Sequence, residues 1–87
     1  MTPPQGGGES VADTVYRIIH ERTGLAVNGD TVPSKPRTEN GLDMTYEAWL
    51  QTVEAILIAL GRSTDGAGQI ASDTHDAPLS DLIWHLE

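Results

Sequence analysis

The stretch that decides the fold is residues 44–60, MTYEAWLQTVEAILIAL. Thr45 is typical of a helix N-cap, and Gly61, directly after the stretch, is typical of a helix end. Apolar side chains recur between them at helical spacing and form one stripe. The stripe consists of Tyr46, Trp49, Leu50, Val53, Ile56, Leu57 and Leu60. We therefore predict a helix over residues 45–60 that is the central element of the fold.

Another helix is predicted on the N-terminal side, from Val11 to about Thr23. Ser10 precedes it as a candidate N-cap, and Gly24 follows it as a candidate C-terminal stop. One face of this helix is apolar at helical spacing. The face consists of Val11, Val15, Ile18 and Ile19. We expect this face to pack against the apolar stripe of residues 45–60.

The third predicted helix lies on the C-terminal side and starts near Asp76, with Asp76 as its N-cap and Pro78 in its first turn. Between the second and third helices we predict a loop, with a single helical turn over residues 69–72 that Ile70 attaches to the core. The core-facing residues of the third helix are Leu79, Leu82, Ile83 and Leu86.

Residues 25–32 leave two alternatives open. Asn28-Gly29 is typical of a tight type I′ turn, which favours a short β-hairpin. Two strands of three residues are marginal alone, so a plain turn is the other alternative. Residues 1–8 are rich in proline and glycine and are predicted to be a disordered tail. The predicted fold is therefore a mainly α, three-helix single domain over residues 9–87, with a short hairpin or a turn at 25–32.

Acidic residues are concentrated in the C-terminal half of the chain. Thirteen acids and five bases give a net charge of −8, and residues 39–87 hold nine of the acids but only one base, Arg62. Such a surface repels nucleic acids and anionic membranes, and it attracts basic protein surfaces. We expect a partner protein with a basic surface and no direct binding to nucleic acid or membrane. The alternative is that the acidity serves solubility alone.

Side chains that could carry catalysis or hold a metal do not form a convincing constellation. The chain has no cysteine, so thiolate nucleophiles and cysteine-bound zinc are excluded. Asp73, His75 and Asp76 are spaced like metal ligands, but a helix cap and a solvated loop explain them as well. Neither His20 nor His85 has a nearby serine nucleophile together with an organising acid. We therefore expect a protein that is not an enzyme and that uses no metal or cofactor.

Targeting signals are also absent from the sequence. No apolar run approaches the ~20 residues of a membrane span. The N-terminus lacks a basic region followed by an apolar one, as a signal peptide would have. We therefore expect the protein to be cytoplasmic.

Five residues are candidates for partner binding. Glu47, Glu54 and Asp65 are acids on or just after the helix at 45–60. Ile58 falls outside its apolar stripe and lies beside small residues, Ala48, Ala55 and Ala59, that let another helix approach. Ile58 either serves a sandwich of helices within the chain or binds a partner. Trp84 falls off the apolar face of the third helix and is either an interface anchor or packed at the edge of the fold.

Residues 44–57, MTYEAWLQTVEAIL, resemble the opening of short, mostly uncharacterised proteins of phages, plasmids and other mobile elements. Those proteins often begin with Met-Thr-Tyr/Phe, followed by Trp and then Val-Asp-x-x-Leu. The chain departs from that pattern, because 43 residues precede Met44 and the usual acidic Leu-Pro-Asp stretch is absent. The resemblance implies an origin in a mobile element, and by analogy a role like that of anti-CRISPR inhibitors of host defence.

Two functional hypotheses follow. The first is a non-catalytic protein-binding module, such as a phage-type inhibitor, whose acidic surface occludes a basic, nucleic-acid-binding groove of a host protein. The second is a small structural or assembly protein that acts as a homodimer through the helix at 45–60.

Overall fold

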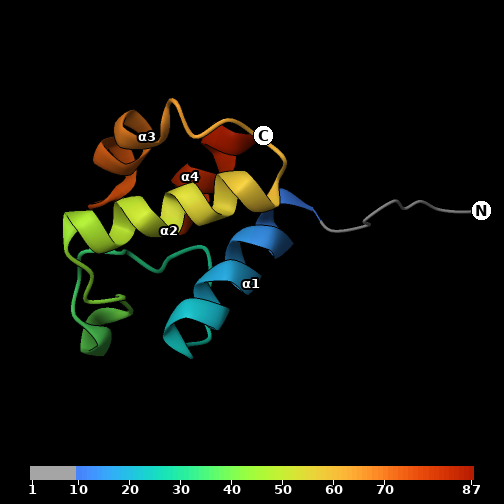
Figure 1. The fold of residues 1–87 in the computed structure, drawn as a ribbon. Coiled ribbons are helices and arrows are strands. Elements are labelled where there is room, and N and C mark those ends of the chain that lie inside the picture. The colour runs from blue at the N-terminus through green and yellow to red at the C-terminus, as the bar shows by residue number, and fades with distance from the viewer. Residues whose placement is uncertain (1–9) are drawn as a thin grey trace, which may run out of the picture.

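The protein, in the form of a computed structural model that describes residues 10–87, is mainly helical. Its α-helices are α1 (Val11–Thr23), α2 (Tyr46–Ala59), α3 (Ala67–Thr74) and α4 (Leu79–Leu86), and a 3₁₀ turn, η1 (Arg37–Glu39), lies between α1 and α2. Helix α2 packs against α1 and α3, and α4 packs against the same two helices (Figure 1). Within the described residues the fold thus has four α-helices rather than the three that were predicted.

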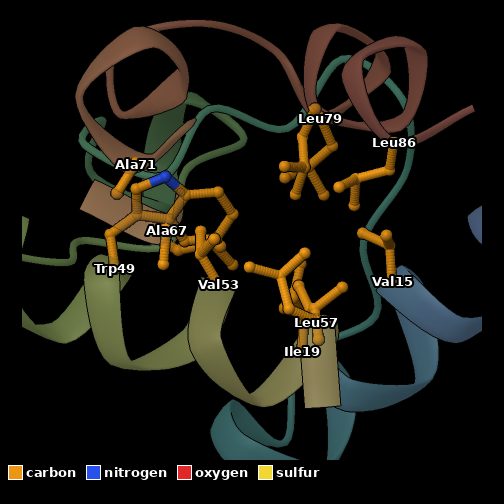
Figure 2. Close-up of a cluster of buried hydrophobic side chains, with 12 residues drawn as sticks. Val15, Ile19, Trp49, Val53, Leu57, Ala67, Ala71, Leu79 and Leu86 are labelled. Atoms are coloured by element: carbon orange, nitrogen blue, oxygen red, sulfur yellow. The ribbon is translucent and has the colours of Figure 1, made fainter. Parts of the chain in front are cut away.

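Each helix contributes side chains to one hydrophobic core (Figure 2). Val15 and Ile19 of α1 and Trp49 and Val53 of α2 are fully buried. The short helices complete the core from the other side. Their buried apolar residues are Ala67, Ala71, Leu79, Leu82 and Leu86. The predicted apolar faces are therefore the faces that the fold buries, although Tyr46 at the start of α2 stays 40% exposed.

Local capping signals set the bounds of α1 and α2. The Asp13 N–H donates to Ser10 Oγ (3.1 Å), and the Ala48 N–H donates to Thr45 Oγ1 (3.2 Å). Both caps satisfy a backbone N–H that the first turn of a helix leaves without a partner. Gly24 follows α1 with φ 74°, in the left-handed region that glycine adopts at low cost. Both helices were predicted to within one residue, and the structure confirms them.

Residues 25–32 form a turn, and the described residues contain no hairpin there. Asn28 Oδ1 accepts from the Asp30 N–H (2.9 Å), which makes a side-chain turn in place of the type I′ turn. The carbonyls of Gly29 and Thr31 accept from the Ser80 and Leu79 N–H groups, at 3.0 and 2.8 Å. These carbonyls are therefore bonded to the start of α4 instead of to a second strand.

The start of α4 corrects the prediction that Asp76 is its N-cap. Pro78 is the N-cap residue, and no side chain caps the helix. Because loop carbonyls already accept from the Leu79 and Ser80 N–H groups, the helix does not need a capping side chain. Asp76 is exposed, two residues before the cap.

Helix α3 replaces the single turn that was predicted over residues 69–72. Ala67 and Ala71 are buried, and their small side chains let α3 lie close to α2. The Trp49 indole N–H of α2 donates to Thr74 Oγ1 (3.0 Å), and that hydroxyl donates to the Ile70 carbonyl (2.7 Å). This buried chain of hydrogen bonds fixes the last turn of α3 on the largest side chain of the core.

A compact loop joins the turn at 25–32 to α2. Val32 and Gly41 form an isolated parallel bridge, and the Asp43 N–H donates to the Lys35 carbonyl (2.9 Å). Below the bridge, buried Thr31 donates to Asn40 Oδ1 (2.9 Å). Asn40 takes the left-handed conformation, with φ 58°. The loop therefore has a fixed shape, and it holds the beginning of both α2 and α4.

Candidate partner-binding surface

Three of the five predicted residues lie on the outer face of α2. Glu47, Glu54 and Ile58 are separated by seven and four positions, which returns each to the same side of a helix. Glu47 is exposed, Glu54 is half-buried, and the Ile58 side chain is 67% exposed. Gln51 is exposed on the same side. We call these four residues, Glu47, Gln51, Glu54 and Ile58, the α2 patch.

The exposure of Ile58 excludes one of the two interpretations of that residue, a sandwich of helices within residues 10–87. A sandwich of helices within the chain would cover it, but α1 and α3 pack against α2 without doing so. The neighbouring alanines are only partly accessible, since Ala48 and Ala55 are half-buried and Ala59 is exposed. The α2 patch thus places the apolar side chain of Ile58 among polar and acidic residues. The alanines beside the patch are partly covered by the rest of the fold.

Trp84 lies on a different helix, on the outer face of α4. Its side chain is 76% exposed, so it is not packed at the edge of the fold. The His85 ring lies beside it, with ring centroids 5.7 Å apart and planes at 76°, so the two rings are not stacked face to face. Asp81 and Glu87, three positions away on either side, are also exposed. We call Ser80, Asp81, Trp84 and Glu87 the α4 patch.

Asp65 belongs to neither patch. It lies in the turn between α2 and α3, is exposed, and its N–H donates to Ser63 Oγ (3.1 Å). The structure therefore places the five predicted residues at three positions: the outer face of α2, the turn that follows it, and the outer face of α4.

The acids of the C-terminal half are not neutralised by bases in the described part of the chain. The ion pair between Arg17 and Glu21 (3.4 Å) lies on α1, outside this half. The guanidinium of Arg62 donates to the Leu86 carbonyl at the end of α4, and not to a carboxylate. Among residues 10–87, no acid of the segment 39–87 has an ion-pair partner. These carboxylates remain available to a partner's cations.

Two of the three histidines, His20 and His75, lie within hydrogen-bond distance of backbone carbonyls. His75 Nε2 lies 2.9 Å from the Met44 carbonyl, which joins the end of α3 to the loop before α2. His20 Nδ1 lies 3.1 Å from the Leu25 carbonyl. Asp73 Oδ1 accepts from the Gln69 side chain (3.0 Å). Asp73, His75 and Asp76 are therefore placed as parts of helix ends and turns, and within residues 10–87 no three potential ligands gather around a metal position.

Residues 10–87 enclose no pocket, and none of their helices is long and apolar enough to cross a bilayer. A site on this part of the chain therefore binds through an exposed face.

Three residues of the α4 patch, Ser80, Asp81 and Glu87, are not among the candidates that the sequence predicts. Asp81 and Glu87 were counted in the net charge, but not as neighbours of Trp84. Their spacing of three residues on either side could have identified them, because residues three apart are neighbours on a helix surface. The contact between Trp84 and His85 had no such signal.

Comparison of the chain with known proteins identified no relative. No family model, no curated protein and no solved structure matches the chain.

Proposed function

We propose that the protein is a non-catalytic binding module that docks its acidic helical surface on a basic surface of a partner protein. The observation that carries this proposal is the pairing of exposed large apolar side chains with carboxylates that have no ion pair. Ile58 and Trp84 are each more than half exposed on the outer face of a helix, and each lies among acids. Interfaces combine these features, with an apolar anchor at the centre and polar groups at the rim.

The negative charge of the C-terminal half indicates that the partner's surface is basic. Residues 39–87 carry nine acids and one base, and that base is bonded to a backbone carbonyl. A surface of this kind speeds the encounter with a basic protein and slows the encounter with nucleic acid. The finer form of the proposal is an inhibitor of phage type, like an anti-CRISPR protein. Its carboxylates would occupy positions in a host groove that otherwise hold phosphates, and the protein would act in the cytoplasm.

The test compares two variants of equal charge in a pull-down from host lysate at low and moderate salt. In the first variant Glu47→Lys, Glu54→Lys and Asp65→Lys reverse the candidate acids. In the second, Glu39→Lys, Asp73→Lys and Asp76→Lys reverse three other exposed acids of the same half. The first variant should retain several-fold less partner than wild type, because its lysines repel the basic surface that the acids attract. The second should lose less, and added salt should weaken the binding of wild type by screening.

If both variants lose the same amount of bound partner, the effect comes from net charge and not from the candidate acids. That result would favour the alternative in which the acidity serves solubility alone. Unchanged binding of the first variant at low salt would contradict the proposal. Circular dichroism of both variants checks that helicity is preserved.

A homodimer through α2 is the second candidate, and the exposure of Ile58 favours it. Sedimentation at micromolar concentration separates the two functions. A dimer that persists as salt rises supports an apolar interface between copies, whereas a monomer supports the binding module.

A further inference from the structure

Trp84 is the most exposed large apolar side chain of the described residues, and its surroundings are polar. Ser80 and Asp81 lie one turn before it on the surface of α4, and both are exposed. Glu87 follows one turn later. A tryptophan presents about 150–250 Å² of surface, far below the roughly 800 Å² that each partner buries in a stable interface. Trp84 alone is therefore too small an apolar area to hold a second copy of the chain.

The other exposed apolar side chains do not extend this area. Ile58 and Tyr46 belong to α2, whereas α4 packs against α1 and α3 in the described part of the chain. What surrounds Trp84 is acidic: Asp81 and Glu87 are exposed and have no ion pair within residues 10–87. An indole ring attracts a cation through its face, and carboxylates attract a cation through their charge. Trp84 and the two acids on either side of it therefore favour the same kind of group, a cation.

No cation of the chain that the structure describes occupies this position. Arg62, the single base of residues 39–87, donates to the backbone carbonyl of Leu86 and makes no ion pair with Asp81 or Glu87 in the described part of the chain. The His85 ring is nearly perpendicular to the indole and leaves it 76% exposed.

We propose that Trp84, Asp81 and Glu87 form a binding site for an arginine side chain of the partner protein. The inference rests on the proposed function and deepens it, since it names the group that the basic partner presents. The guanidinium plane stacks on the indole, and its N–H groups donate to the two carboxylates. Arginine fits better than lysine because its planar, weakly hydrated group can stack and donate at the same time.

The probe is a short blocked peptide with two arginines separated by glycine, compared with the same peptide carrying neutral citrulline. The two indole N–H signals in NMR spectra give an internal control. Trp84 is exposed, whereas the Trp49 indole is buried and bonded to Thr74. We expect the Trp84 signal and the backbone signals of Asp81 and Glu87 to move saturably with the arginine peptide. The Trp49 signal should stay in place, and the citrulline peptide should cause little change.

Matched variants assign the binding to the site. Trp84→Leu should weaken the arginine peptide by about two- to fivefold, the size of a cation–π contact at an exposed position. Asp81→Asn and Glu87→Gln should each weaken it, whereas Asp76→Asn, which removes the same charge elsewhere, should do so less. All four positions are exposed, so each variant should keep the thermal stability of wild type.

Several results would overturn the inference, and they also separate it from the proposed function. If the peptide moves signals of the α2 patch and leaves Trp84 unchanged, the arginine site is wrong and the acidic binding surface stands. If no signal moves at low salt, both are wrong. If the citrulline peptide binds equally well, the site takes a neutral group and not arginine. If the Trp84 signals shift when the protein alone is diluted, the site binds a second copy of the chain.

Discussion

Replacement of Gly41 by alanine should open the loop that holds α2 and α4. A Cβ at this position would lie 1.9 Å from the Lys35 carbonyl oxygen and 2.3 Å from its carbon. Both atoms are backbone, so no side-chain rotation can relieve the overlap. The Lys35 segment must therefore move away from Gly41, although the Asp43 N–H donates to the same Lys35 oxygen.

The size of the effect follows from what that movement breaks. Four backbone hydrogen bonds hold the loop around Gly41. They run from the N–H groups of Val32, Leu42, Asp43 and Met44 to the carbonyls of Asn40, Val32, Lys35 and Pro33. At about 1 kcal/mol each, with partial exposure of the buried Leu42 in addition, we expect a loss of about 3–5 kcal/mol. A domain of this size has only about 5–10 kcal/mol of stability in total.

Urea denaturation followed by circular dichroism measures the loss, and Gly66→Ala is the matched control. Gly66 has φ −94°, and an added Cβ there meets nothing within 4 Å. Alanine at position 66 should therefore change stability by less than about 1 kcal/mol, with a gain as the expected sign. A Gly41→Ala protein within about 1 kcal/mol of wild type would refute the reasoning, because it would mean that the loop can shift without losing its hydrogen bonds.

Two further substitutions test the core and the α2 patch. Thr74→Val should cost about 1–3 kcal/mol, because it leaves the buried Trp49 indole N–H without an acceptor, and most of that cost should vanish in a Trp49→Phe background when unfolding is measured by urea. An equal cost in both backgrounds would show that the hydrogen bond is not its source. Ile58→Asp should keep the melting temperature within about 2 °C of wild type and abolish any association through α2, whereas Leu57→Asp, on the buried side, should unfold the protein. An Ile58→Asp protein that unfolds would show that Ile58 is buried, and one with unchanged association would remove it from the interface.

The parts of the fold that were predicted correctly are those fixed by neighbours in sequence. Ser10 and Thr45 cap the helices that follow them, and each bond spans three residues. Such short-range chemistry can be read directly from the order of residues. The apolar stripe of α2 has the same advantage, because its period is that of the helix.

The remaining elements depend on contacts between distant residues. The turn at 25–32 has the residues of a hairpin, but its carbonyls bond to Leu79 and Ser80. The last turn of α3 depends on the Trp49 side chain of another helix. Neither partner can be identified from local patterns, and alanines at the α3 contact gave a weak hydrophobic signal. For the candidate surface, helical spacing placed Ile58 and Trp84 outside the apolar stripes of their helices, but it left open whether each is exposed or packed within the fold.

The bonds from the turn carbonyls to the start of α4 have a consequence for how the chain folds. The residues they join, Thr31 and Leu79, are more than half of the chain apart. A helix of eight residues is too short to persist in water by itself, so α4 depends on its bonds to the segment before α2 and on its packing against α1 and α3. Bonds of such long sequence separation raise the contact order of the fold, which slows folding. The helix that carries Trp84 therefore depends on the rest of the molecule, and a change that opens the loop should also disturb the position of the exposed indole.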